Sequence, residues 1–94
     1  MYVLVHHTVT DPTDFWSTAQ AALPNIPAGL TLHHTISARD GSRATCLWEA
    51  ESVDAVRNFL EPVLGNSSRN DYSEAENKDG VVVPQRYAVA VVTS

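Results

Sequence analysis

Residues 30–50 have the sequence LTLHHTISARDGSRATCLWEA, and this stretch decides the fold. The two runs 30–38 and 43–50 are each long enough to form one strand. Between them stands the dipeptide Asp40-Gly41, which is the strongest short-range signal for a hairpin. We therefore predict two antiparallel strands joined by a tight turn.

The turn also predicts which residues of the two strands face each other. A two-residue turn and a four-residue loop give the same pairing, in which Thr35 opposes Cys46 and His33 opposes Trp48. One face of the hairpin is then mixed polar and aromatic, and it carries Thr31, His33, Thr35, Ser37, Ala44, Cys46 and Trp48. The other face is more aliphatic, and we expect it to lie under helices: Leu30, Leu32, His34, Ile36, Thr45, Leu47 and Glu49.

The segment before the hairpin is predicted to be a strand followed by a helix. Residues 2–9 are β-branched and aromatic, which is typical of a strand. Thr10 or Asp11 then caps a helix, with Pro12 at its first position. Apolar residues recur at helical spacing until Pro24, which stops the helix.

The segment after the hairpin is predicted to be a second helix and a fourth strand. Ser52 caps a helix with an apolar stripe, and we expect Pro62 to break it, with a short extra turn after it. Residues 66–69 have the composition of a loop, and residues 71–76 alternate as a strand does. Residues 77–94 form a C-terminal extension with extended apolar runs, which either adds a strand or crosses to a partner chain.

This order of elements predicts one α+β domain across residues 1–94, with the ferredoxin-like βαββαβ topology. Both helices then cover one face of an antiparallel sheet. A 94-residue chain buries a limited fraction of its surface, and pairing with a second copy buries more. We therefore expect a homodimer formed through the open sheet face.

Composition excludes several classes of partner and site. The net charge is −5 and the six basic residues are scattered, so we expect neither nucleic acid nor a membrane surface as a partner. The chain opens without a signal-peptide pattern and has no long apolar run, so we expect a cytoplasmic protein. Its single cysteine allows neither an intrachain disulfide nor a metal-binding cysteine pair.

The four histidines form two adjacent pairs, His6-His7 and His33-His34. Neighbouring strand residues point to opposite faces, so neither pair can hold one metal ion with both rings. One histidine of each pair then lies in a cavity as a base or ligand, or in a core or interface with a satisfied hydrogen bond. The valines of the first strand resemble a helix-packed set, which places His6 on the opposite face together with Tyr2.

The candidate site combines these histidines with aromatic and polar neighbours. We expect His33 to be the proton acceptor and His6 a second catalytic group. Trp48 offers a stacking surface for an aromatic ligand, although a strand tryptophan suits a core equally well. The remaining candidate ligand-binding residues are Tyr72, Thr35 and Cys46, the last of which also fits an inert buried thiol. We expect no metal ligands among them and no cofactor.

Residues 45–56, with the sequence TCLWEAESVDAV, resemble the dimeric α+β-barrel superfamily. One similar branch contains the cofactor-independent monooxygenases of antibiotic biosynthesis, which oxidise polycyclic phenols in a cavity between sheet and helices. A strand tryptophan helps to bind substrate there, and Trp48 resembles it. The other similar branch contains small nickel-binding ferredoxin-like proteins.

Three functions are compatible with these patterns. The first is a dimeric small-ligand protein, either a cofactor-independent monooxygenase or an isomerase, acting on an aromatic or polyketide-like compound. The second is a transition-metal protein that uses histidines with Glu74 or Glu76 across a dimer. The third is a non-catalytic assembly module. Whether the protein is an enzyme stays open at this point.

Overall fold

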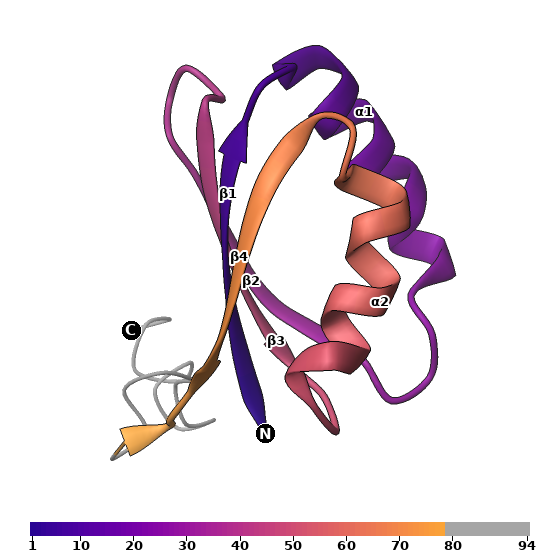
Figure 1. Ribbon diagram of the computed structural model, residues 1–94, viewed down its shortest axis with the longest axis vertical. Helices are drawn as coiled ribbons and strands as arrows, with labels where there is room; N and C mark the ends of the chain where they lie inside the picture. Colours follow the sequence, from indigo (N-terminus) through magenta and orange to yellow (C-terminus); the bar gives the residue numbers. More distant parts are fainter. Residues whose placement is uncertain (79–94) are drawn as a thin grey trace, which may run out of the picture.

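The computed structural model describes residues 1–78. The elements follow in the order β1 (Tyr2–Val9), α1 (Pro12–Ala22), the short 3-10 helix η1 (Leu23–Asn25), β2 (Thr31–Ser37), β3 (Arg43–Glu49), α2 (Val53–Leu64) and β4 (Ser68–Ala75). The strands form one antiparallel sheet in the order β2-β3-β1-β4, and both helices cover the same face of it (Figure 1). The predicted α+β fold is confirmed, whereas the runs expected at 81–83 and 87–92 lie outside the described residues.

Both helices begin at the predicted caps. The Asp11 carboxylate accepts a hydrogen bond from the backbone N–H of Asp14 at 3.1 Å, and the Ser52 hydroxyl oxygen accepts one from the N–H of Ala55 at 3.0 Å. Each cap satisfies a donor that the first helical turn leaves without a partner. Neither helix of the described chain is long and apolar enough to cross a membrane.

Two boundaries differ from the prediction. Pro62 does not break α2, which continues to Leu64. This proline stands in the last turn, where it removes one hydrogen bond, and the Glu61 carbonyl still accepts from the N–H of Gly65 at 2.9 Å. Strand β4 begins at Ser68, inside the predicted loop, because residues 68–70 pair with the end of β1 despite their polar sequence.

The hairpin register is partly as predicted. Thr35 opposes Cys46, in agreement with the turn at Asp40-Gly41. A β-bulge at His33 then shifts the pairing by one residue, so that Leu32 and not His33 opposes Trp48. The predicted pairing of His33 with Trp48 is therefore wrong.

The prediction of which hairpin face lies under the helices is also wrong for β3, although Leu30 and Leu32 of the predicted set do pack against the core. The pairing of β3 with β1 determines which face the helices cover, because Val3 opposes Trp48 and Val5 opposes Cys46. Opposed residues share a face, so the buried valines bring the tryptophan and the cysteine under the helices with them. On the other face, Ile36 is 69% exposed.

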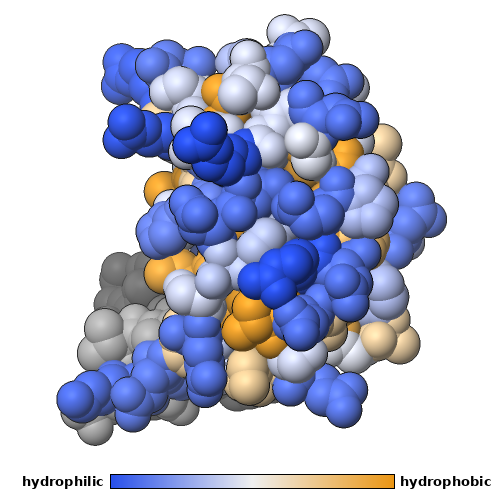
Figure 2. Space-filling model, in the orientation of Figure 1, coloured by the Kyte–Doolittle hydropathy of each residue, from blue (hydrophilic) through white to orange (hydrophobic). Residues whose placement is uncertain are grey.

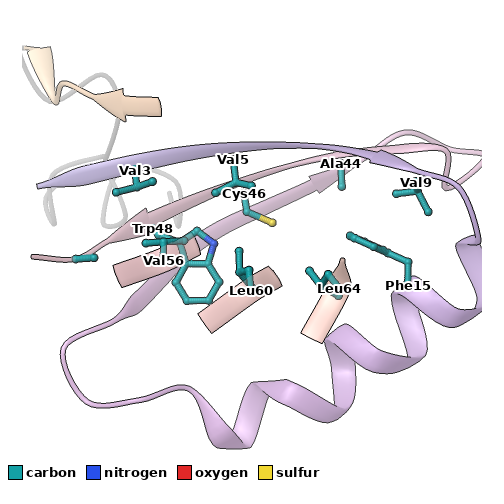
Figure 3. Close-up of a cluster of buried hydrophobic side chains, with 11 residues drawn as sticks. Val3, Val5, Val9, Phe15, Ala44, Cys46, Trp48, Val56, Leu60 and Leu64 are labelled. Carbon is teal, nitrogen blue, oxygen red and sulfur yellow. The ribbon is translucent and has the colours of Figure 1, made fainter. Parts of the chain in front are cut away.

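The core lies between this face of the sheet and the two helices. Figure 3 shows the strand side chains directed toward α2 and Phe15 of α1. The buried apolar set that they form is Val3, Val5, Val9, Phe15, Ala44, Cys46, Trp48, Ala50, Val56, Leu60 and Leu64. On the side of the molecule seen in Figure 2, where the sheet is viewed along its edge, hydrophobic residues form only small separate patches among hydrophilic ones.

Candidate functional site

A cavity of about 420 Å³ lies between the helix-covered face of the sheet and the two helices. Its walls are mainly apolar and aromatic, and they include Phe15, Trp16, Leu32, Trp48, Phe59 and Leu60. Exposed Gln20 and Leu23, at the end of α1 and the start of η1, also line the cavity and form its rim. The volume falls in the range of roughly 300–1,000 Å³ that is usual for small-molecule sites.

Two buried nitrogen atoms in the cavity wall have no hydrogen-bond partner among the described residues. They are Nε2 of His7 and Nε1 of Trp48, in side chains of residues that are 2% and 3% exposed. Buried polar atoms in proteins are nearly always paired, because an unpaired one costs free energy. These two atoms are therefore the positions where a bound molecule would gain most from polar groups of its own.

The hydrogen bonds around Asn70 determine which nitrogen of His7 carries the proton. The Asn70 amide nitrogen donates to the carboxylate of Glu61 at 2.8 Å, so its oxygen faces His7 Nδ1 at 2.6 Å. This oxygen can only accept, and it also accepts from the hydroxyl of Ser68 at 2.7 Å. His7 must therefore donate from Nδ1 when its ring is neutral, which leaves the buried Nε2 of this cavity-wall residue with a free lone pair.

Glu61 of α2 holds Asn70 in this orientation by accepting the hydrogen bond from its amide nitrogen. Its carboxylate also accepts a hydrogen bond from the Tyr72 hydroxyl at 2.5 Å, and the Arg57 guanidinium lies 5.0 Å from the centre of the Tyr72 ring. The hydrogen bonds from Tyr72 and then Asn70 lower the pKa of Glu61. Burial, followed by the bond to Glu61, raises the pKa of Tyr72. The carboxylate is thus ionised and can orient Asn70.

Burial lowers the pKa of His7 below its ordinary value of 6.5, while the hydrogen bond to Asn70 and the charge of Glu61 act in the opposite direction. A ring with a lowered pKa is neutral at pH 7. The site therefore presents an uncharged imidazole, with one nitrogen held by Asn70 and the other free to accept a proton.

The lowered pKa of His7 predicts how stability depends on pH. The unfolded chain binds a proton on this residue near pH 6.5, whereas the folded chain binds it only at lower pH. The free energy of unfolding is therefore not reduced by this residue above pH 6.5. It decreases as the pH falls from 6.5 toward the folded-state pKa of His7, by no more than about 1.4 kcal/mol per pH unit. We expect urea unfolding between pH 8 and pH 5.5 to show this loss.

The adjacent histidine provides the control for this measurement. The variant His7→Phe should lose the part of the pH dependence that comes from His7. The variant His6→Phe, altered on the exposed face, removes only the smallest of the causes that shift the pKa of His7 and should keep most of it. Equal pH dependence in wild type and His7→Phe would contradict a lowered pKa at this position.

Three of the four predicted ligand-binding residues line the cavity: Trp48, Thr35 and Cys46. The Thr35 hydroxyl lies 3.6 Å from the Cys46 sulfur, so these two groups are paired with each other. Burial raises the pKa of the Cys46 thiol, which keeps it protonated. The fourth residue, Tyr72, is bound to Glu61 and does not belong to the cavity wall.

The two predicted catalytic histidines lie on the opposite face of the sheet. His33 Nε2 is 3.0 Å from a carboxylate oxygen of Glu49, and His6 Nδ1 is 3.2 Å from the hydroxyl of Thr45. The expected grouping of these histidines with Trp48 is therefore not found, and their proposed roles stay predictions. Within residues 1–78, no group of three histidine, cysteine or acidic side chains is placed to hold a metal ion.

His7 is the functional candidate that sequence reasoning missed. The sequence did contain an indication of its position. His7 alternates with the same period as Val3, Val5 and Val9, which form the buried side of β1. A histidine in such a series is either a paired core residue or a polar group of an internal site. Its partner Asn70 lies 63 positions away in a stretch predicted as the border of a loop, so the pair could not be read from local sequence.

No family model, curated protein or solved structure matches this chain.

Proposed function

We propose that this protein binds a small, mostly apolar aromatic compound that carries a hydroxyl group, and that His7 accepts the proton of that hydroxyl. The observation that supports this most strongly is the free Nε2 of a neutral, buried imidazole in an apolar cavity. Aromatic walls from Phe15, Phe59 and Trp48 suit a planar ring. A ligand hydroxyl would give the unpaired Nε2 its missing donor.

The reaction that this site favours is proton abstraction. The hydroxyl proton would pass to Nε2, and Nδ1 of the resulting imidazolium would keep its hydrogen bond to Asn70, near the negative charge of Glu61. The ligand would become an anion, which is richer in electrons. Such an anion can be reprotonated at another atom, as in an isomerase, or oxidised by dioxygen as a co-reactant, as in a cofactor-independent monooxygenase.

The cavity is formed by residues of one chain. The proposed binding therefore does not depend on the homodimer that the sequence predicts, which stays a prediction. It also places the chemistry on the helix-covered face and not on the open face that carries His6 and His33.

Calorimetric titration with two matched compounds tests the proposal. We expect 2-naphthol to bind about fivefold more tightly than 2-methoxynaphthalene, which has the same rings but no hydroxyl donor, because one buried hydrogen bond contributes about 1 kcal/mol. The variant His7→Phe should bind both compounds with similar affinity. His6→Phe should behave as wild type. If wild type binds neither compound, or if His7→Phe retains the preference, the proposal is wrong.

A further inference from the structure

The second unpaired nitrogen of the cavity, Nε1 of Trp48, carries information about the ligand. An indole N–H can only donate a hydrogen bond. It belongs to a residue that is 3% exposed, it lines the cavity, and it has no partner among the described residues. Two residues of the cavity wall thus carry a buried polar atom without a partner among the described residues, an acceptor on His7 and a donor on Trp48.

These two groups are separated along the sheet. On β1, Val3 opposes Trp48, and His7 lies four positions further along the same strand. That spacing corresponds to about 13 Å between the backbone positions. The side chains then reach into the cavity from either end of its floor, with the mutually paired Thr35 and Cys46 in between. A ligand that satisfies both nitrogens needs its donor and its acceptor at opposite ends of an apolar body.

The chemistry of the acceptor narrows the ligand class further. A neutral imidazole whose pKa is lowered by burial is a weak base, and a simple phenol, with a pKa near ~10, is a weak acid. A hydroxyl conjugated with a carbonyl is more acidic, because the negative charge of its anion is shared with the carbonyl oxygen. Trp48 is placed to donate to that oxygen, and a hydrogen bond to an anion is stronger than one to a neutral group.

We propose that the cavity selects a conjugated hydroxy-carbonyl compound, with its hydroxyl at His7 Nε2 and its carbonyl oxygen at Trp48 Nε1. On proton transfer the O–H bond breaks and the proton joins Nε2. The electron pair of that bond stays on the ligand and is delocalised toward the carbonyl. This inference rests on the proposed function and adds the class of ligand to it.

Three compounds on one bicyclic skeleton test this inference. In 6-hydroxy-1-tetralone the hydroxyl and the carbonyl are conjugated and lie at opposite ends, 5,6,7,8-tetrahydro-2-naphthol lacks the carbonyl, and 6-methoxy-1-tetralone lacks the donor. We expect wild type to bind the hydroxytetralone about tenfold more tightly than either relative in calorimetric titrations. Its absorption should also shift toward that of the phenolate on binding, at a pH where the free compound is neutral.

Two variants separate the donor of Trp48 from its ring. Trp48→Phe keeps an aromatic side chain without the N–H, so the hydroxytetralone should bind no more than about twofold better than the tetrahydronaphthol. Tyr2→Phe removes a donor from an aromatic side chain that does not line the cavity and should keep the tenfold preference. A preference that survives in Trp48→Phe would overturn the inference.

The comparison of the three compounds in the wild-type protein tests the inference even if Trp48→Phe does not fold. Equal binding of the hydroxytetralone and the tetrahydronaphthol, with weaker binding of the methoxytetralone, would overturn this inference and leave the proposed function intact. Absence of binding by all three compounds would contradict both.

Discussion

Replacing Ala19 with tryptophan should abolish binding of 2-naphthol, with a loss of affinity of at least about 100-fold, while the protein stays folded. Ala19 is a small residue of α1 that lines the cavity, and an indole at this position would occupy the space where the ligand rings lie. The new side chain enters an existing cavity, so it adds apolar contacts without displacing packed neighbours. We therefore expect the free energy of unfolding to stay the same or increase.

The matched control for this variant is Ala21→Trp. Ala21 is an exposed residue of the same helix and is not part of the cavity wall. Calorimetric titration should show wild-type affinity for this control. Unchanged affinity in Ala19→Trp would mean that 2-naphthol binds elsewhere on the protein.

Replacing Phe15 with alanine should lower the free energy of unfolding by about 3–5 kcal/mol. Phe15 is 2% exposed, and its ring makes edge-on contacts with His7 at 5.2 Å and with Trp16 at 4.8 Å between centroids. It also lines the cavity, so the space left by its ring joins a void that the surroundings do not fill. The expected loss is a large share of the roughly 5–15 kcal/mol that is typical of a single domain.

Urea unfolding with Ile36→Ala as the control measures this effect. Ile36 is 69% exposed on the open sheet face, and its truncation should change stability by no more than about 0.5 kcal/mol. A loss below about 1 kcal/mol for Phe15→Ala would show that its ring is not part of the packed core.

Features that depend on local pattern were predictable from the sequence. Strand β1 has the predicted bounds Tyr2–Val9, and the alternation of its valines correctly identified the buried side. The turn at Asp40-Gly41 correctly paired Thr35 with Cys46. Caps at Asp11 and Ser52 follow from side-chain chemistry that acts within three residues.

Features that depend on long-range pairing were not predictable in the same way. The bulge at His33 has no signature of its own in the sequence, yet it moves this residue away from Trp48. The orientation of β3 required its register with β1, where Val3 opposes Trp48. One strand alone left both faces plausible, and the more aliphatic face was wrongly assigned to the helices.

The candidate site also combines residues that local pattern predicts with one that depends on long-range contacts. Trp48, Thr35 and Cys46 line the same cavity, as their shared face of the hairpin predicted, while their role in binding stays a prediction. His7 was missed, because its role depends on Asn70 and Glu61, which reach it from β4 and α2 only after the chain has folded. A histidine that is oriented by hydrogen bonds from residues distant in sequence cannot be recognised from spacing along the chain.

The most direct test of the central claim is a long-range proton–nitrogen NMR spectrum of the histidine rings at pH 7, with His7 assigned through the signals that are missing in His7→Phe. We predict a neutral ring with its proton on Nδ1 and a bare Nε2, and a shift of the Nε2 resonance when 2-naphthol is added. A proton on Nε2 in the ligand-free protein, or an Nε2 resonance that 2-naphthol leaves unchanged, would contradict the role proposed for His7.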